Sequence, residues 1–196
     1  LGIVAKNQGD YARANDFCQQ GLAIFQQLGD QRMVAMLLYN LGFTAYKQGK
    51  YTRAIDFYQQ SLAIDQQLGI PWSICRGFLG LGWVASKQGN SQAIHWFVQA
   101  LRTAHRVQLI PEILWSIVGF VDYLLKDGQT ERAVQYMVLV QHHPAQDSNV
   151  RDALAGIIPR LETAGSSSNR QTMLEQGKAL DLNTVVQKLL DEFVIS

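Results

Sequence analysis

A repeated pattern with a period near 40 residues constrains this chain more than any other feature of its sequence. The pair Leu-Gly recurs at 1–2, 41–42 and 81–82, each pair forty residues from the next. Glycine recurs at 9, 49, 89 and 128, and alanine at 14, 54, 93 and 133, with spacings of forty or thirty-nine. Repeats of this length pack mainly against their sequence neighbours, so the pattern predicts an array of similar units.

Within each unit, apolar and small side chains recur with helical spacing. In the second unit Leu38 and Leu41 share one face of a first helix, and Ala54 and Tyr58 share one face of a second. Between them lies Gly49, a residue type that tolerates the left-handed geometry of a helix end. The sequence therefore predicts helices at about 12–28, 31–48, 51–68, 71–88, 91–108, 111–126 and 130–142.

The pattern changes after residue 143. We expect a further helix over 149–163, kinked or broken at Pro159, because proline interrupts helical hydrogen bonding. A linker rich in Gly, Ser and Asn follows at 165–170. A short helix near 171–178 and an amphipathic helix from Leu182 complete the chain. We expect the apolar stripe of the last helix to cap the end of the array; docking in a groove or on another protein are the alternatives.

The unit from Leu38 to Gly69 resembles a tetratricopeptide repeat (TPR). Leu38, Leu41-Gly42 and Ala45 occupy the positions of W-x-x-L-G-x-x-Y, and Ala54 with Tyr58 those of A-x-x-x-F. The resemblance implies an all-α fold, a right-handed superhelical solenoid of antiparallel helix pairs with extra C-terminal helices. We expect repeats at about 1–40, 41–80, 81–119 and 120–143, a degenerate capping helix at 144–164, a flexible linker at 165–170 and C-terminal helices at 171–196.

Composition argues against several classes of function. A net charge of +1 gives no basic footprint for nucleic acid, and the most apolar segment, 113–125, is shorter than a membrane span. Cys18 and Cys75 lack paired spacing and are interpreted as small buried hydrophobes in a reducing cytoplasm. We therefore expect a cytoplasmic protein that binds neither nucleic acid directly nor a membrane.

No motif supports catalysis, a cofactor or a metal site. His142 and His143 adjoin Pro144 at a helix end, without a nucleophile motif, a phosphate loop or Cys/His ligand spacing. We expect no enzyme activity, no cofactor and no functional metal; adventitious metal binding by the two histidines with Asp147 is the alternative.

The resemblance to TPRs places function on a concave surface formed by the first helix of each pair. Its second, fifth, ninth and twelfth positions face inward and are mainly aromatic or apolar here, which favours an apolar peptide or a partner helix. Packing of the same aromatic residues between repeats, or a small-molecule pocket, are the alternatives. The candidate partner-binding groove comprises Met36, Tyr39, Phe43, Tyr46, Arg76, Leu79, Trp83, Trp115, Val118 and Asp122.

Charged groups near this surface are few. Of the clamp that chaperone-binding TPRs use for a terminal carboxylate, only Asn40 and Arg76 are present. Lys47, Lys87 and Lys126 recur two residues before the loop glycine. We interpret these lysines as favourable charges at helix C-termini, with an anion-binding column as the alternative.

A period of about 40 residues, a drifted last repeat and the tail EQGKALDL at 175–182 are similar to the C-terminal TPR regions of large bacterial signalling ATPases and transcriptional activators. The resemblance implies a non-catalytic protein–protein interaction module, the sensor or partner-binding arm of a larger intracellular regulator with upstream domains. A start within a helix-like pattern at Leu1 favours a fragment of such a protein. The alternative is a receptor for a short peptide or small effector that changes the curvature of the array.

Overall fold

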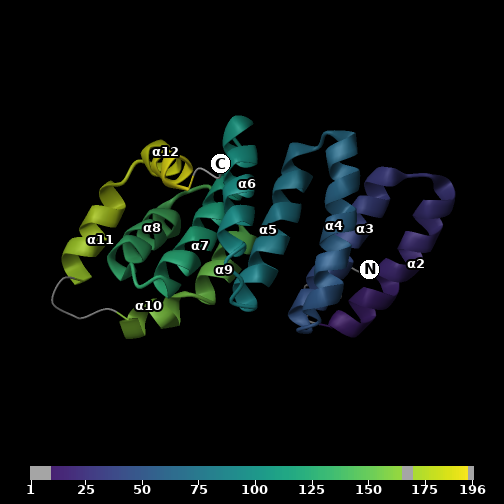
Figure 1. Cartoon of the computed structure of the whole chain (residues 1–196), viewed down its shortest axis with the longest axis horizontal. Coiled ribbons are helices and arrows are strands. Elements are labelled where there is room, and N and C mark those ends of the chain that lie inside the picture. The colour runs from purple at the N-terminus through teal and green to yellow at the C-terminus, as the bar shows by residue number, and fades with distance from the viewer. Residues whose placement is uncertain (1–9, 165–169, 194–196) are drawn as a thin grey trace.

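The computed structural model describes residues 10–164 and 170–193, and within those ranges the chain is all-α (Figure 1). The seven helices expected between residues 12 and 142 are confirmed, each within two residues at either end. The helices are α2 (Tyr11–Leu28), α3 (Gln31–Lys47), α4 (Tyr51–Leu68), α5 (Pro71–Lys87), α6 (Ala93–Arg106), α7 (Ile110–Lys126), α8 (Thr130–His142), α9 (Ser148–Ala155), α10 (Ile158–Ala164), α11 (Arg170–Ala179) and α12 (Leu182–Glu192).

Successive helices pack as antiparallel pairs in two layers. Each helix from α2 to α8 packs against the next along the chain, and α5 also contacts both α3 and α7. The first helices α3, α5 and α7 therefore form one layer, and α4, α6 and α8 form the other. This arrangement is the TPR-like solenoid that the repeat pattern predicts. The inward-facing positions that the repeat pattern predicts for the first unit, Ile3 and Lys6, lie outside the described residues.

Local signals set the ends of the helices. The side chain of Asp30 accepts a hydrogen bond from the Met33 N–H at 3.0 Å and caps α3. Gly49 follows the end of α3 and has a φ of 73°. This left-handed backbone conformation causes little strain in glycine, because glycine lacks a Cβ atom. The second helices α2 and α4 end in the same way at Gly29 and Gly69, but at the corresponding end of α6 the residue is Gln108, whose φ is 56°. A side chain therefore takes the left-handed conformation at one junction of the array.

Two aromatic rings hold the layers together, each lying between glycines of two successive first helices. A Cβ atom on Gly42 or on Gly80 would lie 2.7 Å from ring carbons of Tyr58. Phe97 is held in the same way, because a Cβ atom would lie 2.6 Å from its ring on Gly82 and 2.5 Å on Gly119. Both rings are buried. Glycine is thus required wherever a ring of the second layer is inserted between helices of the first.

The segment after the repeats departs from a regular array. The helix expected over 149–163 is two helices, α9 and α10, and the break lies at 156–157, before Pro159. Pro159 is the second residue of α10, where its missing N–H would have no helical partner in any case. Helix α9 packs mainly against α7, and both α9 and α10 also touch α8, whereas α11 packs much more extensively on α8. The expected linker at 165–170 lies largely outside the described residues.

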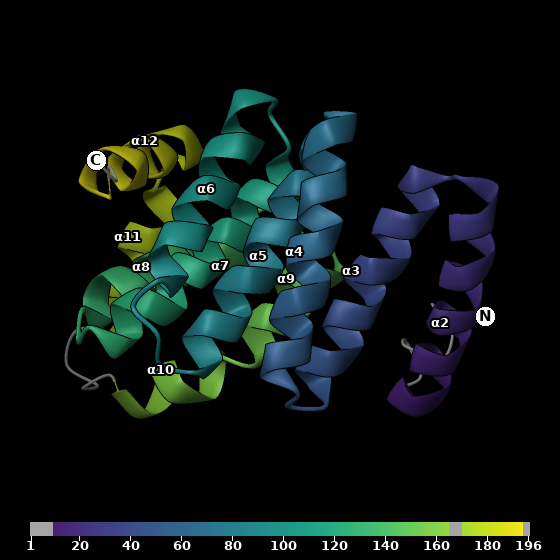
Figure 2. The same cartoon turned by 45° about the vertical axis from the view of Figure 1, so that its right-hand side comes forward.

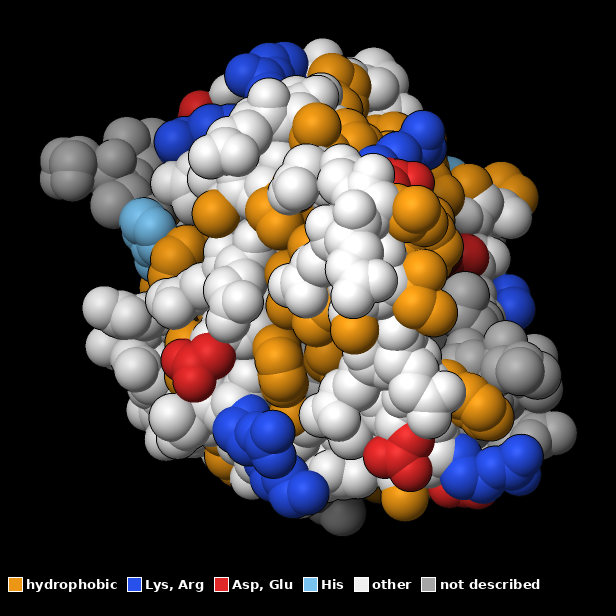
Figure 3. Space-filling view, turned by 90° about the vertical axis from the view of Figure 1, so that its right-hand side faces the viewer, with side chains coloured by type: hydrophobic (Ala, Val, Ile, Leu, Met, Phe, Trp, Pro, Cys, Tyr) orange, Lys and Arg blue, Asp and Glu red, His pale blue; other side chains and the backbone are white. Residues whose placement is uncertain are grey.

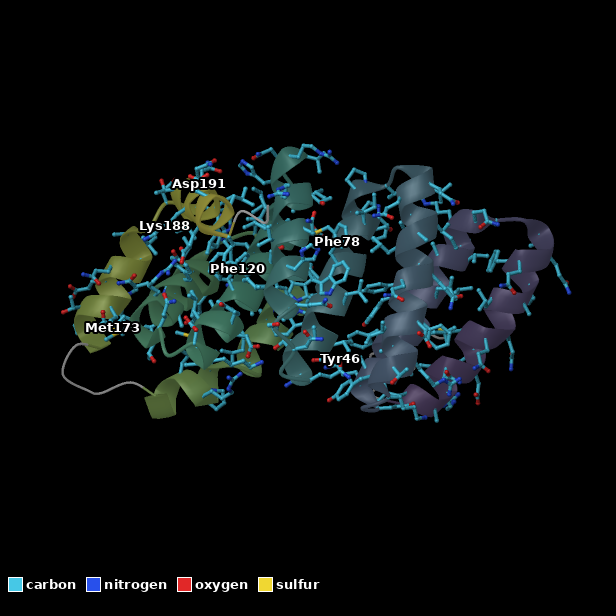
Figure 4. All side chains as sticks on the ribbon, in the orientation of Figure 1. Tyr46, Phe78, Phe120, Met173, Lys188 and Asp191 are labelled. Atoms are coloured by element: carbon cyan, nitrogen blue, oxygen red, sulfur yellow. The ribbon has the colours of Figure 1, made fainter. Side chains whose placement is uncertain are left out.

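The last two helices bury the apolar side of the C-terminal region. α11 packs against α8, and α12 turns back across α6. Val186 and Leu189 of α12 are fully buried, and Phe193 lies 5.5 Å from Phe120, measured between ring centroids. Lys188 and Asp191 lie on the outer side of α12 (Figure 4). The apolar stripe is therefore buried within the chain, while α11 is the helix that covers α8.

The opposite end of the molecule buries less of its apolar surface. Figure 3 shows hydrophobic side chains interspersed with polar ones at this end. On α2, Ile24 is 55% exposed and Leu28 is 70% exposed. The buried side chains of α2 are Ala14 and Cys18.

We predict that Gly80→Ala lowers the free energy of unfolding by about 1–3 kcal/mol, because the new methyl group would overlap the buried Tyr58 ring. Urea denaturation followed by circular dichroism measures this loss. Gly156→Ala is the matched control, because the nearest atom to its Cβ, the Ala153 carbonyl oxygen, is 3.5 Å away. The control should be neutral or slightly stabilising, and equal losses in both variants would contradict the role assigned to Gly80.

Candidate functional site

The candidate groove is formed by side chains on α3, α5 and α7. On α3 the predicted residues Met36, Tyr39, Phe43 and Tyr46 are all half-buried. Tyr46 lies at the lower end of this face in the view of Figure 4. The amino group of Lys47 lies 5.4 Å from the centre of the Phe43 ring, a favourable cation–π position. The α3 part of the surface is therefore aromatic, partly accessible and bordered by a cation.

Tyr39 and Trp83 each take part in packing as well as in the groove surface. The Tyr39 ring centroid lies 5.4 Å from that of the buried Tyr58, and Trp83 lies 5.3 Å edge-on to the buried Phe97. Both side chains remain half-buried rather than fully enclosed. The sequence leaves two alternatives open for Tyr39 and Trp83, a place on the groove surface or in the core. In each residue one part of the ring packs against the core and another part remains accessible.

Arg76 on α5 is bound by acidic groups from two later elements. Its Nε donates to Glu112 Oε1 at 3.3 Å, and its Nη2 lies 4.0 Å from Asp147 Oδ2. Its guanidinium also lies 5.3 Å from the centre of the Trp72 ring. Leu79, one turn further along α5, is completely buried. Of the two residues, Arg76 alone lies where a partner can reach it.

The α7 part of the groove is covered by the chain itself. Trp115 is 9% exposed, Asp122 4% and Val118 0%. Helix α9 contacts α7, and α10 supplies Arg160, whose Nη1 binds Asp122 Oδ1. In Figure 2 α9 lies behind α5. Of the predicted groove residues, those on α3 and Arg76 and Trp83 on α5 are thus partly accessible, whereas Leu79 on α5 and the three on α7 are buried.

Asp122 is the centre of a polar cluster that joins three helices. Its Oδ2 accepts hydrogen bonds from the Ser86 hydroxyl and, at 2.8 Å, from Lys126 Nζ. Lys126 also donates to the Ser86 carbonyl oxygen at 2.8 Å. Burial alone would raise the pKa of Asp122, but the hydrogen bonds from Lys126, Ser86 and Arg160 outweigh it and hold the pKa below its ordinary value. Asp122 therefore stays ionised and holds α10 against α5 and α7.

Two tyrosines of the groove stay protonated near neutral pH. Burial raises the pKa of Tyr39 to about 12, although the charge of Arg76 opposes the shift. Burial also raises the pKa of Tyr46 to about 12, with smaller contributions from Tyr51 and Asp122. Both phenols are thus neutral hydrogen-bonding groups on an otherwise apolar surface.

Sequence reasoning missed the contacts that close the groove. Asp147 pairs with Arg76 and Arg160 pairs with Asp122, and each of these partners lies more than thirty residues further along the chain. The local sequence around Asp147 indicates a helix cap, and Asp147 does cap α9 by accepting a hydrogen bond from the Val150 N–H. Nothing local indicates its ion pair with Arg76. Gly80 and Gly119 could have been recognised, because they stand thirty-nine residues apart, as the third and fourth units do.

Other candidate chemical groups have structural partners. Cys18 and Cys75 are buried, as expected, and Cys75 Sγ lies 3.4 Å from the Ala100 carbonyl oxygen. His142 Nδ1 lies 2.9 Å from the Val138 carbonyl oxygen, and His143 Nδ1 accepts from the Ala145 N–H. Within residues 10–164 and 170–193, no three His, Cys, Asp or Glu side chains are grouped as metal ligands. No helix in those ranges has the length and hydropathy needed to cross a membrane.

We predict that Asp122→Asn lowers the free energy of unfolding by about 1–3 kcal/mol at pH 7. The estimate is below the cost of breaking a fully buried pair, because Lys126 and Arg160 are about 40% exposed and can be rehydrated. The folded pKa of Asp122 is depressed, so its contribution is present above about pH 4 and is lost as the pH falls through the folded pKa. Chemical denaturation at several pH values measures both effects.

The difference between the wild-type chain and Asp122→Asn should therefore shrink in acid. Asp56→Asn, on the exposed side of α4, is the control and should change stability little at any pH. A difference that persists unchanged below about pH 3 would contradict the ionised state assigned to Asp122.

Comparison with known proteins supports the repeat assignment over the N-terminal third of the chain. The family model described as "Tetratricopeptide repeat" matches residues 1–67. Among curated proteins, none matches the chain. The match covers α2, α3 and most of α4, and the later units share the same helix-pair packing.

Proposed function

We propose that the chain is a non-catalytic protein-interaction module that binds a partner protein or peptide on the open part of the groove, over α3 and α5. The proposal extends to its context: the partner-binding or sensor arm of a larger cytoplasmic regulatory protein whose other domains lie upstream. Tetratricopeptide repeats generally mediate binding between proteins, and the family match includes α3. The location of the binding surface rests on the geometry of the groove.

One observation carries the proposal. Met36, Phe43 and Trp83 are half-buried on α3 and α5, whereas the equivalent α7 residues Trp115 and Asp122 are buried, and Asp122 is bound by Arg160 of α10. Aromatic side chains of this kind bury a large area in a complex at a low entropic cost. Helix α9 of the same chain packs on α7, and this contact supports the view that the face accepts a helical segment.

A receptor for a short peptide or small effector is the second candidate. Within the described residues, the buried indole nitrogens of Trp83 and Trp115 have no hydrogen-bond partner. A buried unpaired donor costs about 1–3 kcal/mol, so a ligand oxygen that reached either nitrogen would recover that energy. Such a ligand would have to separate the packed side chains, and this would change the spacing of the helices.

The substitution Phe43→Gln tests the groove. Phe43 is partly accessible, so we expect a small effect on thermal unfolding and a loss of affinity of about tenfold or more for groove ligands. Ligands would be selected on the immobilised wild-type chain from a random-peptide library, then synthesised and measured by fluorescence anisotropy. A ligand-dependent change in the radius of gyration, measured by small-angle scattering, would favour the receptor alternative.

Phe17→Gln is the matched control. Phe17 is also half-buried and also carries a cation over its ring, Arg13 at 5.9 Å, but it lies on α2. The control should bind the selected peptides as the wild-type chain does. If no peptide is selected, or if both variants bind equally, the groove is not the binding surface.

A further inference from the structure

One position of the groove changes its chemistry from repeat to repeat. Phe43, Trp83 and Asp122 are equivalent, because they are forty and thirty-nine residues apart. Each is followed four residues later by a lysine, at 47, 87 and 126. Residues four apart on a helix are neighbours on one face, so each lysine can reach the groove residue of its own helix.

In the last repeat this position is Asp122, and basic side chains of the same chain neutralise its charge. Asp122 pairs with Lys126 at 2.8 Å and with Arg160, which α10 brings into the groove. Lys126 demonstrates that a lysine at this site reaches the groove, because its Nζ also donates to the Ser86 hydroxyl at 2.6 Å. The Asp122 carboxylate is thus paired with Arg160, a basic residue of the α9–α10 segment.

In the two preceding repeats an aromatic ring takes the place of that carboxylate. Lys47 lies over the ring of Phe43 at 5.4 Å, and Lys87 follows Trp83 at the same spacing. Both lysines are exposed, and neither forms an ion pair with any residue that the structure describes. Over α3 and α5 the groove therefore offers an apolar floor with two cations along one border.

The α9–α10 segment shows what kind of occupant this face accepts. Val150 and Leu154 are buried on α9, and Ile157 and Leu161 continue the apolar side into α10. Asp147 approaches Arg76 at the start of the segment, and Arg160 reaches Asp122 near its end. An amphipathic segment with charges placed to match the groove thus already lies beside the open part.

We propose that the open groove binds an acidic amphipathic segment of a partner protein. Its apolar side chains lie against Phe43 and Trp83, and its carboxylates lie over Lys47 and Lys87. Neighbouring packed helices are about 8–10 Å apart, so the two carboxylates are separated by roughly that distance. That separation corresponds to about five to seven residues of a helix or about three residues of an extended chain. This inference rests on the proposed function and adds the charge and spacing of the ligand.

The test is a random-peptide selection on the full chain, performed with the wild type and with the double variant Lys47→Glu/Lys87→Glu. We expect the wild type to select peptides that combine Asp or Glu with Leu, Phe or Trp. The double variant should lose about tenfold or more in affinity for the synthesised peptides and should select basic peptides instead. Raising the salt concentration from about 0.05 M to about 0.5 M should weaken wild-type binding.

Lys178→Glu/Lys188→Glu is the matched control, because it changes the net charge equally at exposed positions on α11 and α12. It should leave the selected peptides and their affinities unchanged. Peptides without an acidic excess, or equal losses in both double variants, would overturn the inference. If such peptides still depended on Phe43, the proposed function would stand without it.

Self-association is the competing occupant. Sedimentation velocity of the wild type and of Lys47→Glu/Lys87→Glu distinguishes it. A wild-type dimer that the double variant dissociates would assign the groove to a second copy of the chain and overturn the proposal. A monomer in both cases, together with selection of acidic peptides, would support it.

Discussion

The insertion of an aromatic ring between two glycines is the contact on which the rest of this structure depends. Tyr58 lies between Gly42 and Gly80, and Phe97 lies between Gly82 and Gly119. Each ring joins one helix of the second layer to two helices of the first, so it sets both the pairing and the stacking. These contacts hold α3, α5 and α7 side by side.

Charge then divides that face into two parts. Asp122 in the last repeat holds α10 through Arg160, and Arg76 lies near Asp147 at the start of α9. These contacts hold the α9–α10 segment against α7, and both of its helices also touch α8. On α3 and α5 the positions equivalent to Asp122 are Phe43 and Trp83. These aromatic side chains cannot form the ion pair that Asp122 forms with Arg160. The partly accessible surface over α3 and α5 is a consequence of that difference.

Part of the candidate site was predictable from sequence. Period and inward register identify Tyr39, Phe43 and Trp83 as first-helix residues on one face, and all three remain partly accessible. The burial of Val118 was not predictable. Register defines which way a side chain points, but burial depends on what packs over it. Here the covering segment follows a drifted repeat, and its apolar pattern fits several docking positions equally well.

The sequence by itself determined the helices, their antiparallel pairing and the all-α solenoid. Those features follow from local hydrogen bonding, helix caps such as Asp30 and a glycine pattern that recurs with each unit. Only the tertiary structure decided that α11, rather than the segment directly after the repeats, covers α8. The physical reason is that this choice depends on pairs distant in sequence, Arg160 with Asp122 and Arg76 with Asp147. Such pairs form only after the helices are in place, so no local pattern encodes them.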